Sequence, residues 1–152
     1  HLLKDSVSTI QKKESSLKRY RARKRYYKPG RRVMIIGVGV DICEISRIKK
    51  ILLRDKEQFK ARILSNGEMC KDTPEAFAKR FAAKEAVSKA LGCGIGSQLS
   101  FQDITLAHHD SGQPYVALSA KAIERFGDIT FHLSLSDEAG LAAAYVVAEK
   151  AS

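Results

Sequence analysis

The sequence has no tryptophan, few prolines and only three cysteines, and it contains no long apolar run. Its longest uninterrupted apolar stretch, residues 141–148, falls far short of the ~20 residues that span a bilayer. Cys43, Cys70 and Cys93 form no CxxC pair and have no histidines at zinc-site spacing. No apolar core of a signal peptide is visible at the start. We therefore expect a cytoplasmic protein with reduced thiols and without a membrane segment.

Acidic residues are scarce only in the first fifth of the chain. The formal net charge is +10, and residues 1–33 hold 12 Lys/Arg against 2 Asp/Glu, whereas residues 34–152 hold 15 of each. A nucleic-acid-binding domain carries its positive charge on the folded surface. The even balance of residues 34–152 therefore argues against such a domain.

The basic segment 1–33 has too few apolar residues to form a core, so we expect a disordered N-terminal extension. It could bind RNA or anionic lipid through its charge and tyrosines, or it could be a targeting segment. We favour an extension without independent function, because the pattern of a folded domain begins only at Met34. A protein that starts at Met34 is then expected to fold and to keep full activity.

The apolar pattern of residues 34–152 predicts one compact α+β domain. Strands are expected at 34–42, 101–108, 114–118, 131–136 and 141–148. Helices are expected at 46–64 with a break around 54–55, at 74–91 and at 120–126, and hairpin turns at 110–113 and 137–140. The sequence has no GKS or GKT phosphate loop, which excludes a P-loop nucleotide-binding protein.

Two carboxylates stand where a solvated charge is unexpected: Asp41 at the end of an apolar strand and Glu85 within helix 74–91. One arc of that helix is apolar, with Ala82, Ala83, Ala86, Val87 and Ala90. The opposite half carries Arg80, Lys84, Glu85, Ser88 and Lys89, with Phe77 and Phe81 among them. An acid among bases and rings suits a phosphorylated, ring-bearing ligand beside Mg²⁺, which binds carboxylates and phosphates. The alternatives are a solvated helix face with i,i+4 ion pairs and a capping role for Asp41.

A third group lies on the strand expected at 131–136. Alternation places His132, Ser134 and Ser136 on one face of this strand. A histidine between two hydroxyls can bind phosphate or transfer protons near neutral pH. A half-buried structural histidine is the alternative.

Three motifs carry a resemblance to a known family: GVGVDICEISRI at 37–48, RFAAKEAVSKALGCGIG at 80–96 and HLSLSDE at 132–138. In this order, with SFQDI at 100–104 and SGQPYV at 111–116, they resemble the holo-acyl-carrier-protein synthases, the short bacterial-type 4'-phosphopantetheinyl transferases. The resemblance covers essentially all of residues 34–152. It implies a small, mostly antiparallel sheet packed by helices. It also implies a Mg²⁺-dependent transferase of fatty acid biosynthesis that moves the 4'-phosphopantetheine arm of coenzyme A to a serine of apo-acyl carrier protein and releases adenosine 3',5'-bisphosphate.

Matched motif by motif, the resemblance assigns the candidate site residues. Asp41 and Glu85 are the expected metal ligands, and Lys89 and His132 join them as expected catalytic residues. The residues expected to bind coenzyme A are Arg80, Phe81, Lys84, Ser88, Lys89, Gly92, Gly94, Pro114, His132, Ser134 and Ser136. The residues expected to meet the acidic carrier are Arg47, Lys50 and Arg54.

The resemblance further implies a homotrimer with active sites at subunit boundaries. The group that deprotonates the carrier serine stays open between a metal-bound water, Glu85 and His132. Cys43 and Cys93 lie inside the motifs without an assigned role. Two rival functions remain: a metal-dependent hydrolase of nucleotide phosphates, and an RNA-binding module that acts through residues 1–33.

Overall fold

The structure is a computed structural model that describes Gly30 and residues 32–152. The predicted disorder of the basic extension falls almost entirely outside the described residues. The folded unit spans Val33–Ala151. Its elements in chain order are β1 (Val33–Glu44), α2 (Ile45–Ile63), α3 (Pro74–Ala90), the 3₁₀ helix η1 (Phe101–Asp103), β2 (Ile104–His108), β3 (Pro114–Leu118), α4 (Ala120–Phe126), β4 (Ile129–Glu138) and β5 (Leu141–Ala151).

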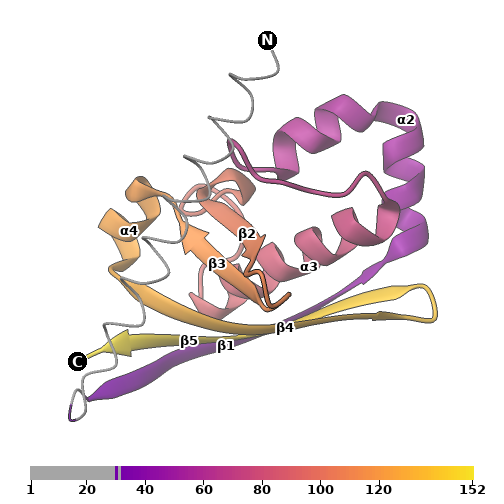
Figure 1. Cartoon of the computed structure of the whole chain (residues 1–152). Helices are drawn as coiled ribbons and strands as arrows, with labels where there is room; N and C mark the ends of the chain where they lie inside the picture. Colours follow the sequence, from indigo (N-terminus) through magenta and orange to yellow (C-terminus); the bar gives the residue numbers. More distant parts are fainter. Residues whose placement is uncertain (1–29, 31) are drawn as a thin grey trace, which may run out of the picture. The chain divides into compact units, whose positions relative to one another are not determined.

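Two antiparallel sheets build this unit, which confirms the predicted α+β class. The larger sheet has the strand order β1-β5-β4, and the smaller one is the β2-β3 hairpin. Helix α3 lies along one face of the larger sheet, and α2 packs against α3 (Figure 1). The buried core includes side chains of α3, of the larger sheet, of α2 and of the β2-β3 hairpin.

Glycine and alanine let α3 approach the sheet closely. A Cβ atom added at Gly37 would lie 1.8 Å from the carbonyl oxygen of Ala90, and one added at Gly39 would lie 1.8 Å from that of Ala86. Main chain therefore touches main chain at both positions, since any side chain there would overlap the helix. The predicted alanine arc of α3 is the face that makes this contact.

Local signals set the ends of α3. The Thr73 side chain accepts a hydrogen bond from the Ala76 amide, and Pro74 occupies the first turn. Both features are typical of a helix N-terminus. The helix ends at Ala90, and Gly92 follows with a φ of +74°, a conformation that favours glycine.

The break predicted around 54–55 in α2 is confirmed, because Asp55 has non-helical dihedral angles. The strand predicted at 101–108 is partly wrong, since residues 101–103 form η1. There Ser100 and Asp103 form a capping box, which competes with strand pairing.

Strand β1 is longer than predicted. Ile42 and Cys43 continue its pairing with Ala143 and Ala142 of β5, so Asp41 lies inside the strand and not at its end. The β4-β5 hairpin is also longer, and its turn shrinks to Ala139 and Gly140, which both have positive φ.

One face of the larger sheet carries apolar side chains that α3 does not cover. Val38, Val40 and Ile42 of β1 and Tyr145 of β5 are at least half exposed there. We call these four residues the outer apolar face. Among the described residues, no helix is long and apolar enough to cross a membrane.

Candidate active site

Asp41 and Lys89 meet where β1 passes α3. Alternation along β1 puts Gly37, Gly39 and Asp41 on the side that faces the helix. The Lys89 Nζ lies 3.1 Å from Oδ1 of Asp41 and donates a hydrogen bond of 3.0 Å to the carbonyl oxygen of Val40. The prediction that these residues share one site is thus consistent with their contact.

Glu85 lies one turn before Lys89 on α3. Burial raises the pKa of the Glu85 carboxyl, and the negative charge of Asp41 raises it further. The charges of Lys89, Arg47 and Arg62 act in the opposite direction. A cation bound by both acids would offset this repulsion between the charges of Asp41 and Glu85.

These two acids fit Mg²⁺ by their chemistry. Among residues 32–152 there is no group of three or more His, Cys, Asp or Glu side chains placed to hold a metal ion. Mg²⁺ commonly takes one or two carboxylates and completes its shell with substrate phosphates and water. A pair of acids beside a lysine suits an ion that binds together with a phosphorylated substrate.

The alternative of a solvated helix face does not describe the polar half of α3. Arg80, Lys84 and Ser88 are buried, whereas Lys89 is exposed. Ser88 donates a hydrogen bond to the carbonyl oxygen of Glu85. The carbonyl of Ser88 accepts from the amides of Cys93 and Gly94 and thereby fixes the loop after the helix.

Lys84 is 0% exposed, and protein atoms accept hydrogen bonds from its ammonium group. Its Nζ donates to Oε2 of Glu68 at 2.6 Å, to the carbonyl of Ile63 at 2.6 Å and to that of Phe101 at 3.2 Å. Burial lowers the pKa of Lys84, and the Glu68 carboxylate opposes this change. An ammonium group has three protons, so these three acceptors leave none for a diphosphate. The contacts of Lys84 therefore argue against its predicted role in binding coenzyme A.

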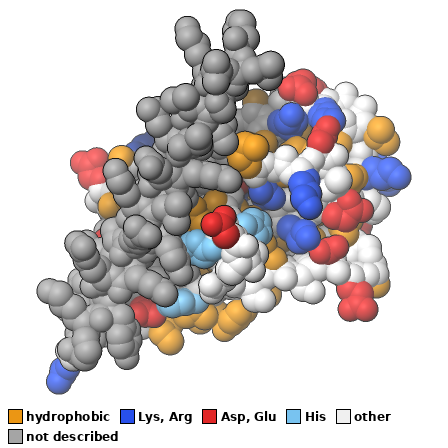
Figure 2. Space-filling view, viewed as in Figure 1, with side chains coloured by type: hydrophobic (Ala, Val, Ile, Leu, Met, Phe, Trp, Pro, Cys, Tyr) orange, Lys and Arg blue, Asp and Glu red, His pale blue; other side chains and the backbone are white. Residues whose placement is uncertain are grey.

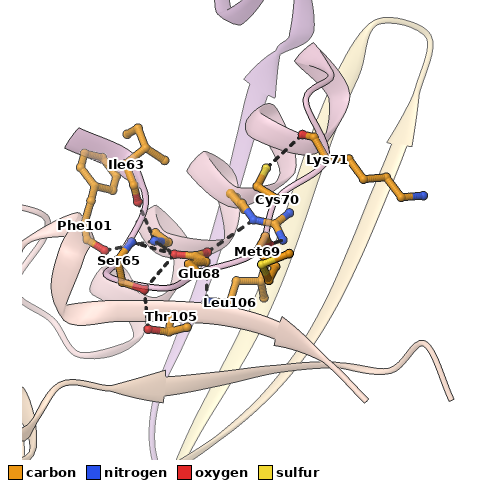
Figure 3. Close-up of polar contacts among 11 residues, drawn as sticks. Ile63, Ser65, Glu68, Met69, Cys70, Lys71, Phe101, Thr105 and Leu106 are labelled. Carbon is orange, nitrogen blue, oxygen red and sulfur yellow. Dashed lines mark hydrogen bonds and ion pairs between the residues drawn. The ribbon is translucent and has the colours of Figure 1, made fainter. Parts of the chain in front are cut away.

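Glu68 was missed at the sequence level. It lies in the segment between α2 and α3, and its carboxylate accepts bonds from Ser65 and Lys84 at Oε2 and from Leu106 at Oε1 (Figure 3). The spacing Ser65-x-x-Glu68 is that of a capping box, and this was the available signal.

A cavity of about 710 Å³ brings together Arg80 of α3, Pro114 of β3 and Ser134 of β4. Lys71 and Lys79 also line it, so its wall carries several positive charges. These three predicted coenzyme-binding residues come from separate parts of the sequence. An open, cationic cavity of this size can hold a phosphorylated ligand.

His132 lies apart from the acids within one chain. Alternation places it on the sheet face opposite Asp41, together with Ser134 and Ser136. Its Nε2 is 2.8 Å from Oε2 of Glu149. The structure thus does not bring His132 to Asp41 and Glu85 in a single copy.

The predicted carrier-binding residues lie on α2. Arg47, Lys50 and Arg54 are exposed, and Figure 2 shows Lys and Arg side chains interspersed with acidic ones on this side of the molecule. The Arg47 guanidinium lies 5.5 Å from the ring centre of Phe81. Carrier-binding and coenzyme-binding candidates thus meet at this pair.

Comparison with known proteins supports one family. The model of the 4'-phosphopantetheinyl transferase superfamily matches residues 37–148. The chain belongs to this superfamily. A holo-[acyl-carrier-protein] synthase of Vibrio vulnificus is 48% identical over 123 residues, which cover 76% of this chain and 98% of the relative.

Solved structures agree with the transferase fold. The crystal structure of the Neisseria meningitidis holo-[acyl-carrier-protein] synthase matches with a TM-score of 0.71 and 37% identity, over 77% of this chain and 100% of that one. The Helicobacter pylori enzyme, solved in complex with coenzyme A, matches with a TM-score of 0.69 and 42% identity, over 73% and 98%. The predicted family, fold class and enzyme class, holo-[acyl-carrier-protein] synthase, are confirmed.

Proposed function

We propose that this transferase moves the 4'-phosphopantetheine arm of coenzyme A to a serine of apo-acyl carrier protein and releases adenosine 3',5'-bisphosphate. The observation that carries the proposal is the contact of Lys89 with Asp41 where β1 meets α3, one helical turn after Glu85. In this proposal Asp41 and Glu85 hold Mg²⁺. The bound ion would stabilise the negative charge that develops on the diphosphate.

The residues of the chain have distinct roles in the transfer. Lys89 is exposed beside Asp41, so its ammonium can neutralise a diphosphate oxygen. Arg80 holds another part of coenzyme A in the cavity that Pro114 and Ser134 also line. The carrier serine attacks the phosphorus of the phosphopantetheine arm, and the bond to the adenosine phosphate breaks. Glu85 and His132 both remain candidates for accepting the serine proton.

We infer that the protein works as a homotrimer with shared sites. The outer apolar face is 50–63% exposed at its four residues, which is costly unless another surface covers it. Its edge strand β1 also carries Asp41. A second copy that packs around this edge strand could bring its own His132 to Asp41, which the single chain keeps apart. We also propose that the protein is cytoplasmic.

We propose that the carrier binds along α2 next to Phe81. Arg47, Lys50 and Arg54 give this helix a basic exposed side, which attracts an acidic partner. The matched relatives carry the carrier protein in their name. Carriers of fatty acid synthesis and of polyketide synthesis are compared in the assay.

Intact-mass spectrometry tests the function directly. Apo-carrier is incubated with the protein, coenzyme A and Mg²⁺, and the expected product is carrier heavier by one phosphopantetheine arm. A chelator in excess should stop the reaction, and renewed Mg²⁺ should restore it. An unmodified carrier from every tested source would contradict the proposal. Nucleotide released from coenzyme A without any carrier would favour the rival hydrolase.

A further inference from the structure

Glu68 forms a buried carboxylate shared by two buried cations. Its side chain is 0% exposed, as is that of Lys84, and that of Arg80 is 9% exposed. A buried charge is costly unless partners compensate it. Oε2 of Glu68 receives the bond from Lys84 described above, and Oε1 lies 3.4 Å from Nε of Arg80. The single negative charge of Glu68 is therefore the counter-ion of both Lys84 and Arg80.

Lys84 and Arg80 are not satisfied equally. The three acceptors around Lys84 match its three protons. Arg80 has five N–H donors, but among residues 32–152 its hydrogen bonding is limited to one bond, from Nη2 to the carbonyl oxygen of Met69. Its buried Nε makes no hydrogen bond, so the contact with Glu68 is purely electrostatic. The uncompensated charge of the cluster is thus on Arg80, at the cavity wall.

We propose that Glu68 is a positioning residue for coenzyme A binding, because it holds the guanidinium of Arg80 at the orientation from which the free donors reach the ligand. This inference rests on the proposed contact of Arg80 with coenzyme A. Ser65 and Leu106 anchor the Glu68 carboxylate, and Lys84 neutralises the oxygen that Arg80 does not use. Lys84 thereby supports Arg80 through Glu68 without touching the ligand.

A double-mutant cycle tests the coupling of the two residues. Arg80→Ala, Glu68→Gln and the double variant are assayed with saturating carrier and Mg²⁺ while coenzyme A is varied. We expect each single change to raise KM for coenzyme A about tenfold, the scale for a lost contact to a charged group. We expect the double variant to match Arg80→Ala alone, because Glu68 has no effect once its target is removed. KM for the carrier should change by less than about twofold in all variants.

Thr105→Val is the matched control. Thr105 Oγ1 contacts Ser65 Oγ at 2.6 Å, so this variant loosens the same segment but leaves every Glu68 contact in place. KM for coenzyme A should then stay within about twofold of the wild type. A rise equal to that of Glu68→Gln would mean that the segment is merely structural.

The outcomes separate this inference from the proposed function. A normal KM in Arg80→Ala rejects the contact of Arg80 with coenzyme A. A raised KM in Arg80→Ala, combined with a normal or strictly additive effect of Glu68→Gln, rejects only the role of Glu68. Partial unfolding of Glu68→Gln lowers the apparent kcat but not KM. If Glu68→Gln does not fold at all, Glu68→Asp takes its place, because its carboxylate lies one methylene group farther from Arg80. KM for coenzyme A should still rise in Glu68→Asp. A normal KM for coenzyme A in that variant overturns the inference.

Discussion

Lys89 of α3 and Asp41 of β1 join two elements at one carboxylate, with 3.1 Å between Nζ and Oδ1. The two residues are 48 positions apart in the sequence. Their contact depends on the absence of side chains at Gly37 and Gly39, which lets α3 lie directly on the strand. The candidate site is therefore a product of close helix–sheet packing.

Removing either acid should abolish turnover without unfolding the protein. Asp41→Asn and Glu85→Gln keep the shape of the side chain but remove a charge needed to hold Mg²⁺. We expect kcat/KM to fall about a hundredfold or more in each. Asp110→Asn, in the exposed β2-β3 hairpin, is the control and should have normal activity. Near-normal turnover in both acid variants would reject the site.

The close contact at Gly39 predicts a large loss of stability on adding one methyl group. In Gly39→Ala the new Cβ would meet the Ala86 oxygen and the Ala90 nitrogen, at 1.8 and 2.9 Å, and both are main-chain atoms. We expect the free energy of unfolding in urea to fall by about 3 kcal/mol, as in severe overpacking. Gly96→Ala, where the new Cβ meets nothing within 4 Å, should be close to neutral. Equal stability of the two variants would contradict the packing described here.

Glu85 should make stability depend on pH with a particular sign. Its carboxyl pKa is raised by burial and by Asp41, so the folded state binds the proton more tightly than the unfolded state. The contribution of Glu85 to the free energy of unfolding therefore decreases as pH rises from the unfolded pKa through the raised folded value. We expect Glu85→Gln to match the wild type at about pH 4 and to exceed it in urea melts at about pH 7. A less stable variant at neutral pH would show that the charge is favourable.

The outer apolar face predicts an assembly that one charge can disrupt. Val40→Glu places a carboxylate at its centre, and we expect light scattering to show a monomer in place of a trimer. Leu53→Glu changes an even more exposed apolar residue, on α2, and should leave the assembly intact. A wild-type monomer at micromolar concentration would refute the trimer.

Charge reversal on α2 should affect the carrier and not coenzyme A. In the double variant Lys50→Glu/Arg54→Glu, repulsion of an acidic carrier should raise its KM about tenfold at low salt and less at high salt. Lys121→Glu/Arg125→Glu, on the exposed side of α4, changes the net charge equally and is the matched control. An equal effect of the two changes would mean that only net charge matters.

Much of the fold could be predicted from local patterns. The cap at Thr73, the break at Asp55 and the alternation of β4 all correspond to short-range signals. The capping box at Ser100 and Asp103 was also local, but the apolar run around it favoured a strand.

The candidate site was only partly predictable. Asp41 and Glu85 were recognisable because a charge stood beside apolar residues. The burial of Lys84 and Arg80 was not, because the segment that covers that side of α3 has no periodic apolar pattern. Glu68 compensates both cations from that segment, and such a long-range pairing leaves no trace in helical spacing.

The main-chain contact between β1 and α3 has a consequence for protein engineering. Since main chain touches main chain at Gly37 and Gly39, no core side chain sets the distance between β1 and α3 there. Changes to apolar side chains elsewhere in the core should therefore leave the distance between β1 and α3, which carry the two proposed metal ligands, unchanged. A change of metal preference should therefore come from substitutions of Asp41 and Glu85 themselves. Stabilising substitutions elsewhere in the core should not alter the geometry of the site.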